Sequence, residues 1–318
     1  MTDNVLKVTN LTKIFTSWSL KKLKPIKTSF TAVDQLCFEI NEGEIIGLLG
    51  PNGAGKTTTA QMLIGCLTPT KGKISYFNQP FLNRDPAIMQ KLNFASAYSD
   101  LPRRMTVEEN LDVFARLYQV PNRKKRIQEL LTTFEVADLI KKPVASLSSG
   151  QKTRVILAKA FINYPRLLLL DEPTASLDPE IAVKVRQFLI KQRDEYGVAM
   201  LFTSHNMKEV EDICDRIIFL NHGRKIAEDT PTGLAKRIKK IKLKILVVAN
   251  QDKAETYLTH KNARFYWKKN HLTINTSDQQ LPKIIYRLSE QGVRYKNIEV
   301  IRPSLEDFFL KIAKEAKQ

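Results

Sequence analysis

A glycine-rich segment that ends in lysine and threonine offers the clearest chemistry in this sequence. Residues 50–57 read Gly-Pro-Asn-Gly-Ala-Gly-Lys-Thr and fit the pattern G-x-x-x-x-G-K-[ST], whose backbone N–H groups wrap around a phosphate chain. In this pattern the lysine, Lys56, reaches the β- and γ-phosphates, and the hydroxyl of Thr57 binds Mg²⁺. The expected phosphate-binding residues are Gly50, Pro51, Asn52, Gly53, Ala54, Gly55, Lys56, Thr57 and Thr58.

The residues on either side supply the elements that must position this loop. The apolar run Ile45–Leu49 predicts a strand, and Thr58–Leu67 predicts a helix. A helix start adds unpaired N–H groups and the positive end of the helix dipole, both of which favour an anion. A glycine-rich turn with an exposed lysine is the alternative, and the strand–loop–helix context argues against it. The sequence therefore predicts that the chain binds a nucleoside triphosphate.

A second chemical signal is an acidic pair that follows four consecutive leucines. Leu167–Leu170 suit a strand buried on both faces of a parallel sheet, so Asp171 and Glu172 would lie at the carboxyl edge, where α/β sheets bind ligands. We expect Asp171 to hold Mg²⁺, directly or through water. Glu172 is expected to polarise the attacking water as a general base, a role worth about 10²–10⁴ in rate. An acidic turn without function is the alternative.

A serine-rich segment between these two sites predicts a further helix start. Ser148 and Gln151 have the spacing of a capping box, so the helix predicted over Lys152–Asn163 should begin there. Ser, Gly and Gln at an exposed helix start offer hydroxyl and N–H donors to an anion. Taken alone, this segment is also ordinary loop chemistry.

The order and spacing of these segments resemble the ATP-binding-cassette (ABC) ATPase family. Gly50–Thr57, Leu147–Gln151 and Leu167–Glu172 are similar to its phosphate loop, its signature and its acidic strand end. The signature residues are Leu147, Ser148, Ser149, Gly150 and Gln151, and the residues that resemble the D-loop are Ser176, Leu177 and Asp178. The resemblance covers roughly residues 5–235. It implies an α/β fold with a P-loop NTPase (RecA-like) core and a helical subdomain.

Two further residues take a role from this resemblance. His205, which follows the strand predicted over Val198–Phe202, matches the switch histidine that bonds the γ-phosphate region. Phe15 matches the aromatic residue that stacks on adenine. The alternatives are a loop histidine with structural partners only and a phenylalanine of the core.

The resemblance also implies how ATP is used. Two copies associate head to tail as a homodimer, and each ATP contacts the phosphate loop of one copy and Leu147–Gln151 of the other. The γ-phosphate supplies a charge that two helix starts share across an otherwise weak interface. Hydrolysis removes that bridge and the dimer opens, so ATP shifts the population between open and closed states.

One position departs from the family pattern. The family carries a glutamine shortly before a segment that matches Thr106–Asn110, and the aligned position here is Ala97. That glutamine contacts Mg²⁺ and couples the site to the partner, whereas an alanine side chain can bind neither metal nor water. Ser96 or Ser99 could substitute, bound water could fill the gap, or the alignment could be shifted. We expect Ala97→Gln to leave ATP binding intact.

The elements divide the chain into a nucleotide-binding domain, 1–235, and a C-terminal α+β domain, 236–318. About residues 98–154 are expected to form the helical subdomain, which faces the transmembrane partner in the family. Thr106 and Glu109 predict a capping box there. The apolar face of the following helix is predicted from Leu111, Phe114, Ala115, Leu117 and Tyr118.

Residues 16–31 carry four lysines and no acidic residue, and we expect a basic insertion between two early strands. Trp18, Leu20 and Leu23 lie among these lysines and could touch lipid headgroups. An ordinary exposed loop is the interpretation that we favour.

After residue 235 the pattern changes to short strands and helices, which indicates a small α+β unit. Ile241, Leu243 and Ile245 alternate with lysines as in a half-exposed strand. Further predictions are a hairpin of Arg264–Trp267 and Leu272–Asn275, a helix over Leu281–Gln291, a strand over Val293–Ile301, and an amphipathic helix over Ser304–Ala316 with Leu305, Phe308, Phe309 and Ile312 on one side. This part resembles the C-terminal extension of cassettes that pair with ABC-2-type exporters.

The composition limits the function classes. The net charge is +18 over 318 residues, and residues 236–318 carry 19 Lys/Arg against 8 Asp/Glu. This charge suits an anionic membrane surface or nucleic acid, or it belongs to a solvated surface without a partner. The three scattered cysteines suggest a reducing compartment, and no apolar run approaches the roughly 18 residues that span a bilayer. The chain is expected to be cytoplasmic, peripheral on the inner face of the cell membrane.

Three functions follow from these observations. The favoured one is the ATP-hydrolysing subunit of an ABC-2-type exporter, which drives a separately encoded transmembrane permease. The second is a cassette ATPase that acts on nucleic acid or ribosomes; the charge favours it, but the single cassette and the lack of a heptad run argue against a nucleic-acid partner. The third is an inactive regulatory cassette, against which Lys56, Asp171, Glu172 and His205 all argue.

Overall fold

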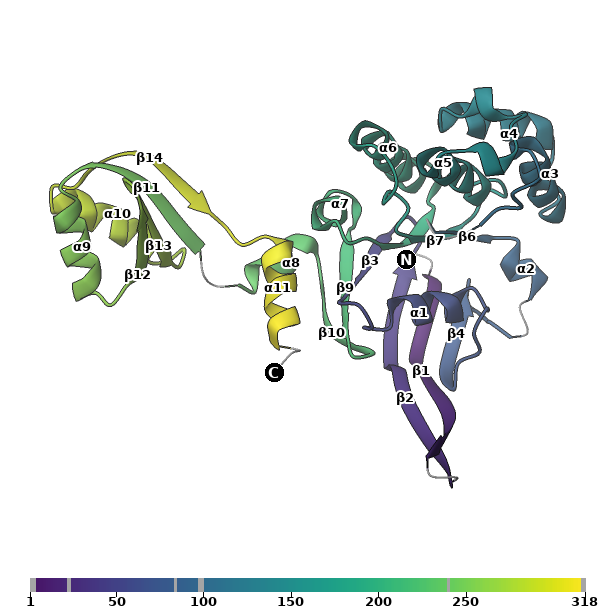
Figure 1. Ribbon diagram of the computed structural model, residues 1–318, viewed down its shortest axis with the longest axis horizontal. Coiled ribbons are helices and arrows are strands. Elements are labelled where there is room, and N and C mark those ends of the chain that lie inside the picture. The colour runs from purple at the N-terminus through teal and green to yellow at the C-terminus, as the bar shows by residue number, and fades with distance from the viewer. Residues whose placement is uncertain (1–3, 22–23, 83–84, 97–99, 239–240, 316–318) are drawn as a thin grey trace. The chain divides into compact units, whose positions relative to one another are not determined.

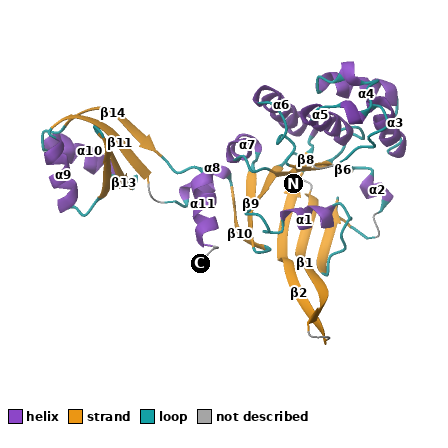
Figure 2. Ribbon diagram, viewed as in Figure 1, coloured by secondary structure: helices purple, strands orange, loops and turns teal. Residues whose placement is uncertain are grey.

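The computed structural model describes residues 4–21, 24–82, 85–96, 100–238 and 241–315. The chain divides into two compact units, Met1–Pro231 and Thr232–Gln318. Most of their elements are labelled in Figure 1, and Figure 2 colours them by type. Within the described ranges, none of the helices has the length and apolar character needed to cross a bilayer.

A six-stranded sheet forms the centre of the first unit. Its order is β10-β9-β3-β8-β7-β6, and all neighbours are parallel except β10 and β9. The strands are β3 (Ile45–Leu49), β6 (Leu92–Ser96), β7 (Leu167–Asp171), β8 (Ala199–Thr203), β9 (Arg216–Asn221) and β10 (Arg224–Asp229). Because β3, β7 and β8 are adjacent and parallel, the loops that follow them emerge at one edge of the sheet. The strands predicted over Ile45–Leu49 and at the four leucines are confirmed.

A second, antiparallel sheet has the order β2-β1-β4-β5. Its strands are β1 (Asn4–Lys21), β2 (Lys24–Asn41), β4 (Lys71–Tyr76) and β5 (Gln79–Pro80). Apolar side chains of both sheets share one buried cluster, which also takes in Met62 and Leu63 of α1 (Lys56–Leu63). Burial of these two side chains fixes α1 against the core.

The prediction of a loop insertion at residues 16–31 is wrong. The two strands continue through it as a hairpin, with Phe15 opposite Phe30 and Ser17 opposite Thr28. The hydroxyls of Ser17 and Thr28 lie 2.7 Å apart in a hydrogen bond. Backbone pairing therefore extends beyond the core, and Figure 1 shows this hairpin reaching away from the rest of the sheet. The side chains of Trp18, Leu20 and Leu23 lie outside the described residues.

Residues 98–154 contain two helices and the start of a third, and the three are in contact with one another: α3 (Val107–Leu117), α4 (Arg123–Thr133) and α5 (Ser149–Ala160). The capping box of α3 is confirmed, because Thr106 Oγ1 accepts from the Glu109 N–H at 3.2 Å and Glu109 Oε2 accepts from the Thr106 N–H at 2.8 Å. Leu111 and Ala115 are buried, but Leu117 is exposed. At about 100° per residue, Leu117 lies roughly 120° around the helix from Leu111, outside the buried stripe.

The remaining helices of the first unit are α2 (Pro86–Met89), α6 (Pro179–Tyr196) and α7 (Met207–Ile213), with 3₁₀ turns at Ala137–Leu139 and Val144–Ser146. Helix α6 follows the β7 loop and α7 follows the β8 loop. Both helices therefore begin close to the edge at which the parallel strands end.

The second unit contains an antiparallel sheet of order β12-β13-β11-β14. Its elements are α8 (Pro231–Lys236), β11 (Ile241–Ala249), α9 (Gln251–His260), β12 (Arg264–Lys268), β13 (His271–Thr276), α10 (Leu281–Glu290), β14 (Arg294–Ile301) and α11 (Leu305–Glu315). The predicted strands, hairpin and two helices are confirmed. The sequence reading missed α8 and α9, and α9 is mostly polar, with only Ala254 and Leu258 buried against the sheet.

Candidate nucleotide-binding site

The glycine-rich loop adopts a conformation that only glycine tolerates at two positions. Gly50 has φ +152° and Gly55 has φ +101°, and an added Cβ would lie 2.3 Å from the Leu220 carbonyl oxygen and 2.5 Å from the Ala32 carbonyl oxygen, respectively. Helix α1 begins at Lys56, two residues before the predicted start, and no side chain caps it. Its first N–H groups thus lack a side-chain acceptor and suit an anion.

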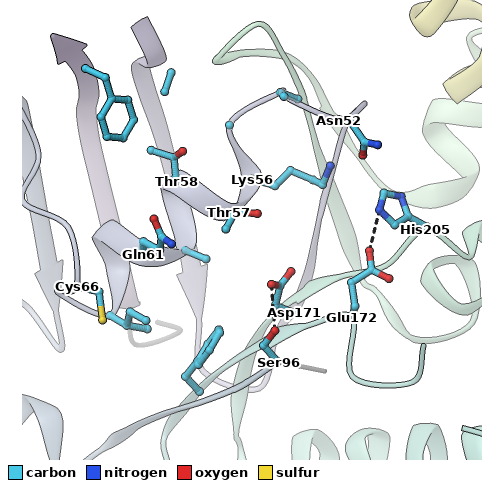
Figure 3. A pocket seen from close by; sticks show the side chains of 18 of the residues that line it. Asn52, Lys56, Thr57, Thr58, Gln61, Cys66, Ser96, Asp171, Glu172 and His205 are labelled. Carbon is cyan, nitrogen blue, oxygen red and sulfur yellow. Dashed lines mark hydrogen bonds and ion pairs between the residues drawn. The ribbon is translucent and has the colours of Figure 1, made fainter. Parts of the chain in front are cut away.

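The loop forms one wall of a cavity of about 710 Å³ (Figure 3). The other walls come from the β1–β2 hairpin, from the ends of β6 and β7, and from the loop after β8. The lining residues that carry functional groups are Asn52, Lys56, Thr57, Thr58, Gln61, Cys66, Ser96, Asp171, Glu172 and His205. Residues far apart in sequence therefore meet around one space.

The ammonium of Lys56 is held by the loop itself. Its Nζ donates to the carbonyl oxygens of Gly50 at 2.7 Å and Pro51 at 3.2 Å. Burial lowers the pKa of Lys56, and the nearby carboxylates of Glu172 and Asp171 oppose that shift. The charge is thus partly desolvated and directed into the cavity, as Figure 3 shows, where it would attract phosphate strongly.

Asp171 is fixed by two hydroxyl groups. Its Oδ1 accepts from Thr203 Oγ1 at 2.6 Å, and its Oδ2 accepts from Ser96 Oγ at 3.4 Å. The Thr57 hydroxyl lines the same cavity (Figure 3). This donor set consists of oxygen atoms only, which fits Mg²⁺. Ala97 and Ser99, two of the positions considered for the missing glutamine, lie outside the described residues.

Glu172 and His205 form a pair at the part of the cavity lined by the loops after β7 and β8. His205 Nε2 lies 3.0 Å from Glu172 Oε1 (Figure 3). The Glu172 side chain is 11% exposed and that of His205 is 58% exposed, so the histidine can move toward a ligand while the carboxylate remains enclosed. Burial raises the pKa of Glu172, and Asp171 adds to this shift, while His205 and Lys56 oppose it.

The backbone of Glu172 is unusual and explains how its side chain is directed. Its φ is +55°, a left-handed conformation that is uncommon for a non-glycine residue. The Glu172 N–H donates to the carbonyl oxygen of Thr203 at 3.1 Å and to its Oγ1 at 3.2 Å. The loop after β7 is thereby bound to the end of β8, which turns the carboxylate toward His205.

Two phenylalanines of the β1–β2 hairpin line the cavity. Phe15, the predicted adenine-stacking residue, is partly exposed there. Phe30 lies opposite it across the hairpin and lines the same cavity. Sequence reasoning missed Phe30 because residues 16–31 were interpreted as a loop. Strand alternation up to Thr31 could have revealed the pairing.

The signature and D-loop residues do not line this cavity. Ser148 caps α5: its Oγ accepts from the Gln151 N–H at 3.2 Å and its N–H donates to Gln151 Oε1 at 3.0 Å, which confirms the predicted capping box. A Cβ on Gly150 would lie 3.0 Å from the Ser176 carbonyl oxygen. The structure therefore places Leu147–Gln151 beside Ser176–Asp178. Neither segment lines the cavity that contains Lys56 of the same chain.

The fold and this cavity define a P-loop nucleotide-binding protein, and comparison with known proteins gives its family. The family described as "ABC transporter" matches residues 33–175. The uncharacterized ABC transporter ATP-binding protein YhcH of Bacillus subtilis (strain 168) is 32% identical over 288 residues, which cover 91% of this chain and 93% of that protein. This chain belongs to the family of ABC transporter ATP-binding proteins.

Relatives named "Nod factor export ATP-binding protein I" are also similar. That of Neorhizobium galegae is 41% identical over 214 residues, 65% of this chain and 60% of the relative. That of Rhizobium johnstonii is 35% identical over 294 residues, 88% of this chain and 89% of the relative.

Solved structures confirm the fold class. A structure titled as the ATP-binding subunit of an ABC transporter aligns with a TM-score of 0.65 and 25% identity, covering 80% of this chain and 99% of that chain. A dimeric, post-hydrolysis ATP-binding cassette bound to ADP and Pi aligns with a TM-score of 0.63 and 26% identity, over 71% of this chain and 98% of that one.

Proposed function

We propose that this chain hydrolyses Mg-ATP as a head-to-tail homodimer and drives export through a separate ABC-2-type permease, on the cytoplasmic face of the membrane. The observation that carries the proposal is the single cavity that unites Lys56, Asp171, Glu172 and His205. Export is supported by the relatives named for Nod factor export.

ATP would enter with its phosphates at the start of α1 and its base at Phe15 and Phe30. Lys56 exchanges the Gly50 and Pro51 carbonyl oxygens for phosphate oxygens, while the loop N–H groups surround the phosphate chain. The exposed phenylalanine faces give the adenine a surface on which to stack. Binding would therefore exchange hydrogen bonds from the Lys56 ammonium to neutral carbonyl oxygens for bonds to anionic phosphate oxygens.

The residues that would hold Mg²⁺ are Thr57 and Asp171, with Ser96 positioning the carboxylate. Mg²⁺ held by these residues would neutralise charge on the β- and γ-phosphates. The hydroxyl of Thr203 fixes Asp171 Oδ1, so the carboxylate keeps its orientation without a ligand.

Glu172 acts as the general base. The water oxygen bonds to the γ-phosphorus as the bond to the bridging oxygen of ADP breaks, and the water proton passes to the Glu172 carboxylate. The raised pKa of Glu172 makes it a better proton acceptor near neutral pH. His205 Nε2, which now lies 3.0 Å from Glu172, donates to a γ-phosphate oxygen.

The second copy would complete the site. Leu147–Gln151 and Ser176–Asp178 lie outside the cavity of their own chain, so they are available to the nucleotide of another copy. The N–H groups at the start of α5 can meet the γ-phosphate there. The similarity to a cassette solved as a dimer supports this arrangement.

Substitution Glu172→Gln tests the proposal. We expect ATP-dependent dimers that persist on size-exclusion chromatography, with hydrolysis about 10²–10⁴ times slower because no base accepts the water proton. Glu195→Gln makes the same chemical change on the exposed side of α6 and should behave as the wild type. Unchanged hydrolysis by Glu172→Gln would remove this residue from its role.

Co-expression with the candidate permease tests the coupling. The permease should copurify with this chain in detergent and change its rate of ATP hydrolysis. A salt-sensitive association with RNA or DNA that alters hydrolysis, with no effect of the permease, would instead favour the nucleic-acid function.

A further inference from the structure

One buried carboxylate in the first unit has no part in the mechanism above. Glu209 lies on α7 and is 6% exposed. Its Oε2 accepts from Thr174 Oγ1 at 2.6 Å and from Ser204 Oγ at 3.1 Å, and its Oε1 accepts from the Arg186 guanidinium at 3.0 Å. Three donors therefore compensate the cost of burying this charge.

The three donors come from three separate segments. Thr174 lies in the loop after β7, two residues beyond Glu172. Ser204 directly precedes His205 in the loop after β8. Arg186 belongs to α6, which begins immediately after Asp178. One carboxylate thus connects the loop that carries the proposed base, the loop that carries the histidine, and the helix that follows Ser176–Asp178.

The position of His205 depends on its backbone neighbours. Its side chain is largely exposed, so packing does not hold it. Ser204 is fixed by its bond to Glu209, and the Ser204 Oγ also accepts from the Asn206 N–H at 3.0 Å. The residues on both sides of His205 are therefore restrained through a hydroxyl that Glu209 orients.

We propose that Glu209 is a positioning residue for ATP hydrolysis. It keeps the Glu172 and His205 loops in the arrangement that allows their 3.0 Å contact, and through Arg186 it connects this arrangement to α6, the helix that follows Ser176–Asp178. Since Ser176–Asp178 is the segment proposed to face the second copy, the network gives dimer closure a route to the hydrolytic groups. This inference rests on the proposed function, because it assigns Glu209 a role in that same reaction.

Substitutions at Glu209 separate positioning from simple bracing of α6 and α7. Glu209→Ala should leave KM and the affinity for ATP within about twofold, because the α1 loop is untouched, and should lower kcat about tenfold or more. Glu209→Gln retains an acceptor for Arg186 and an amide that can bond the two hydroxyls, so it should recover much of kcat. Asp212→Asn is the matched control, since Asp212 is exposed on the same helix, 4.0 Å from the same arginine.

A double-mutant cycle with His205→Ala gives the decisive readout. If Glu209 acts by positioning His205, Glu209→Ala should lower kcat little further in the His205→Ala background. If Glu209 only braces the fold, the two losses multiply, and that result would overturn the proposal. A wild-type kcat in folded Glu209→Ala would do the same.

If Glu209→Ala does not fold, Ser204→Ala tests the same proposal. It removes one of the three bonds to Glu209, together with the bond from the Asn206 N–H, and leaves the carboxylate paired with Arg186 and Thr174. We expect kcat to fall several-fold at unchanged ATP affinity, again without a further loss in the His205→Ala background; full kcat would contradict the inference. Failure of the proposed function looks different, because the wild type itself would then show no ATP turnover, which would overturn both.

Discussion

The two helix starts that could meet a phosphate, those of α1 and α5, differ in how they satisfy their own N–H groups. Helix α1 follows a left-handed glycine and has no side-chain cap. Helix α5 has a complete capping box between Ser148 and Gln151. The first lines the cavity beside Lys56, and the second lies outside the cavity of its own chain.

This difference indicates which site depends on its ligand. An uncapped helix start keeps its donors for an anion at a cost in stability, whereas a capping box satisfies two donors internally. Helix α5 is therefore stable without nucleotide and retains the N–H groups of its first turn that the box does not use. We interpret the start of α1 as the site that binds the phosphates of ATP, and the start of α5 as the segment with which a second copy contacts that ATP.

The largest expected effect comes from adding a methyl group to Gly55, the residue that precedes α1. Gly55→Ala places a Cβ 2.5 Å from the Ala32 carbonyl oxygen at φ +101°, so we expect the affinity for ATP to fall by more than about 100-fold in isothermal titration. Gly53→Ala is the control, since its φ is +79° but nothing lies within 4 Å of the added Cβ. Equal losses in the two variants would show that strain alone, and not the shape of the α1 start, decides binding.

Lys56→Met should weaken ATP binding about 100-fold, because a charge-assisted contact to the phosphates disappears. In the wild-type protein, burial lowers the pKa of Lys56, so the charged lysine reduces folding stability at every pH below its unfolded-state pKa. Removing it should leave the unfolding temperature unchanged or higher. A clear drop in that temperature would mean that Lys56 mainly supports the loop.

Ser148→Ala tests whether the start of α5 contacts the ATP bound by a second copy. Loss of the cap should cost about 1 kcal/mol of folding free energy. Hydrolysis at saturating ATP should fall about tenfold, because the first turn of α5 in the variant would no longer be held in place against the ATP of the other copy. ATP affinity of the monomer should not change. Thr106→Ala removes the equivalent cap of α3, so it should show a similar loss of stability with normal hydrolysis; matching losses of activity would contradict a role for α5.

The smallest effect is expected from pH. The pKa of Glu172 is raised in the fold, so kcat/KM should fall as the pH drops through a value above the ordinary range of a glutamic acid, where the base becomes protonated. Over the neutral range this amounts to a few-fold change at most. The residual activity of Glu172→Gln should not show this fall of kcat/KM at low pH. If the fall persists in the variant, a group other than Glu172 causes it.

The sequence was sufficient wherever a few neighbouring residues decide the structure. The strand at Ile45–Leu49, the glycine loop and both capping boxes depend on local backbone sterics and on hydrogen bonds across three residues. The buried strand β7 is evident from its leucines alone. These local rules also placed Asp171 and Glu172 at the edge of the sheet.

Other features require contacts between distant segments. The many lysines of residues 16–31 favoured the interpretation as an exposed insertion, so Phe30 became visible as a cavity residue only through its pairing with Phe15. Helix α9 has only two buried side chains, and its stability comes from the sheet beneath it. Glu209 looks like an ordinary surface acid in the sequence.

Sequence alone determined that this protein has a phosphate loop, an acidic strand end and a capped serine helix, because each is encoded within a short stretch of chain. Tertiary structure decided which of these share a cavity and which remain apart. The order of the parallel strands brings the Glu172 and His205 loops together and leaves Ser148 outside. Strand order is set by packing over the whole core, which no local pattern specifies.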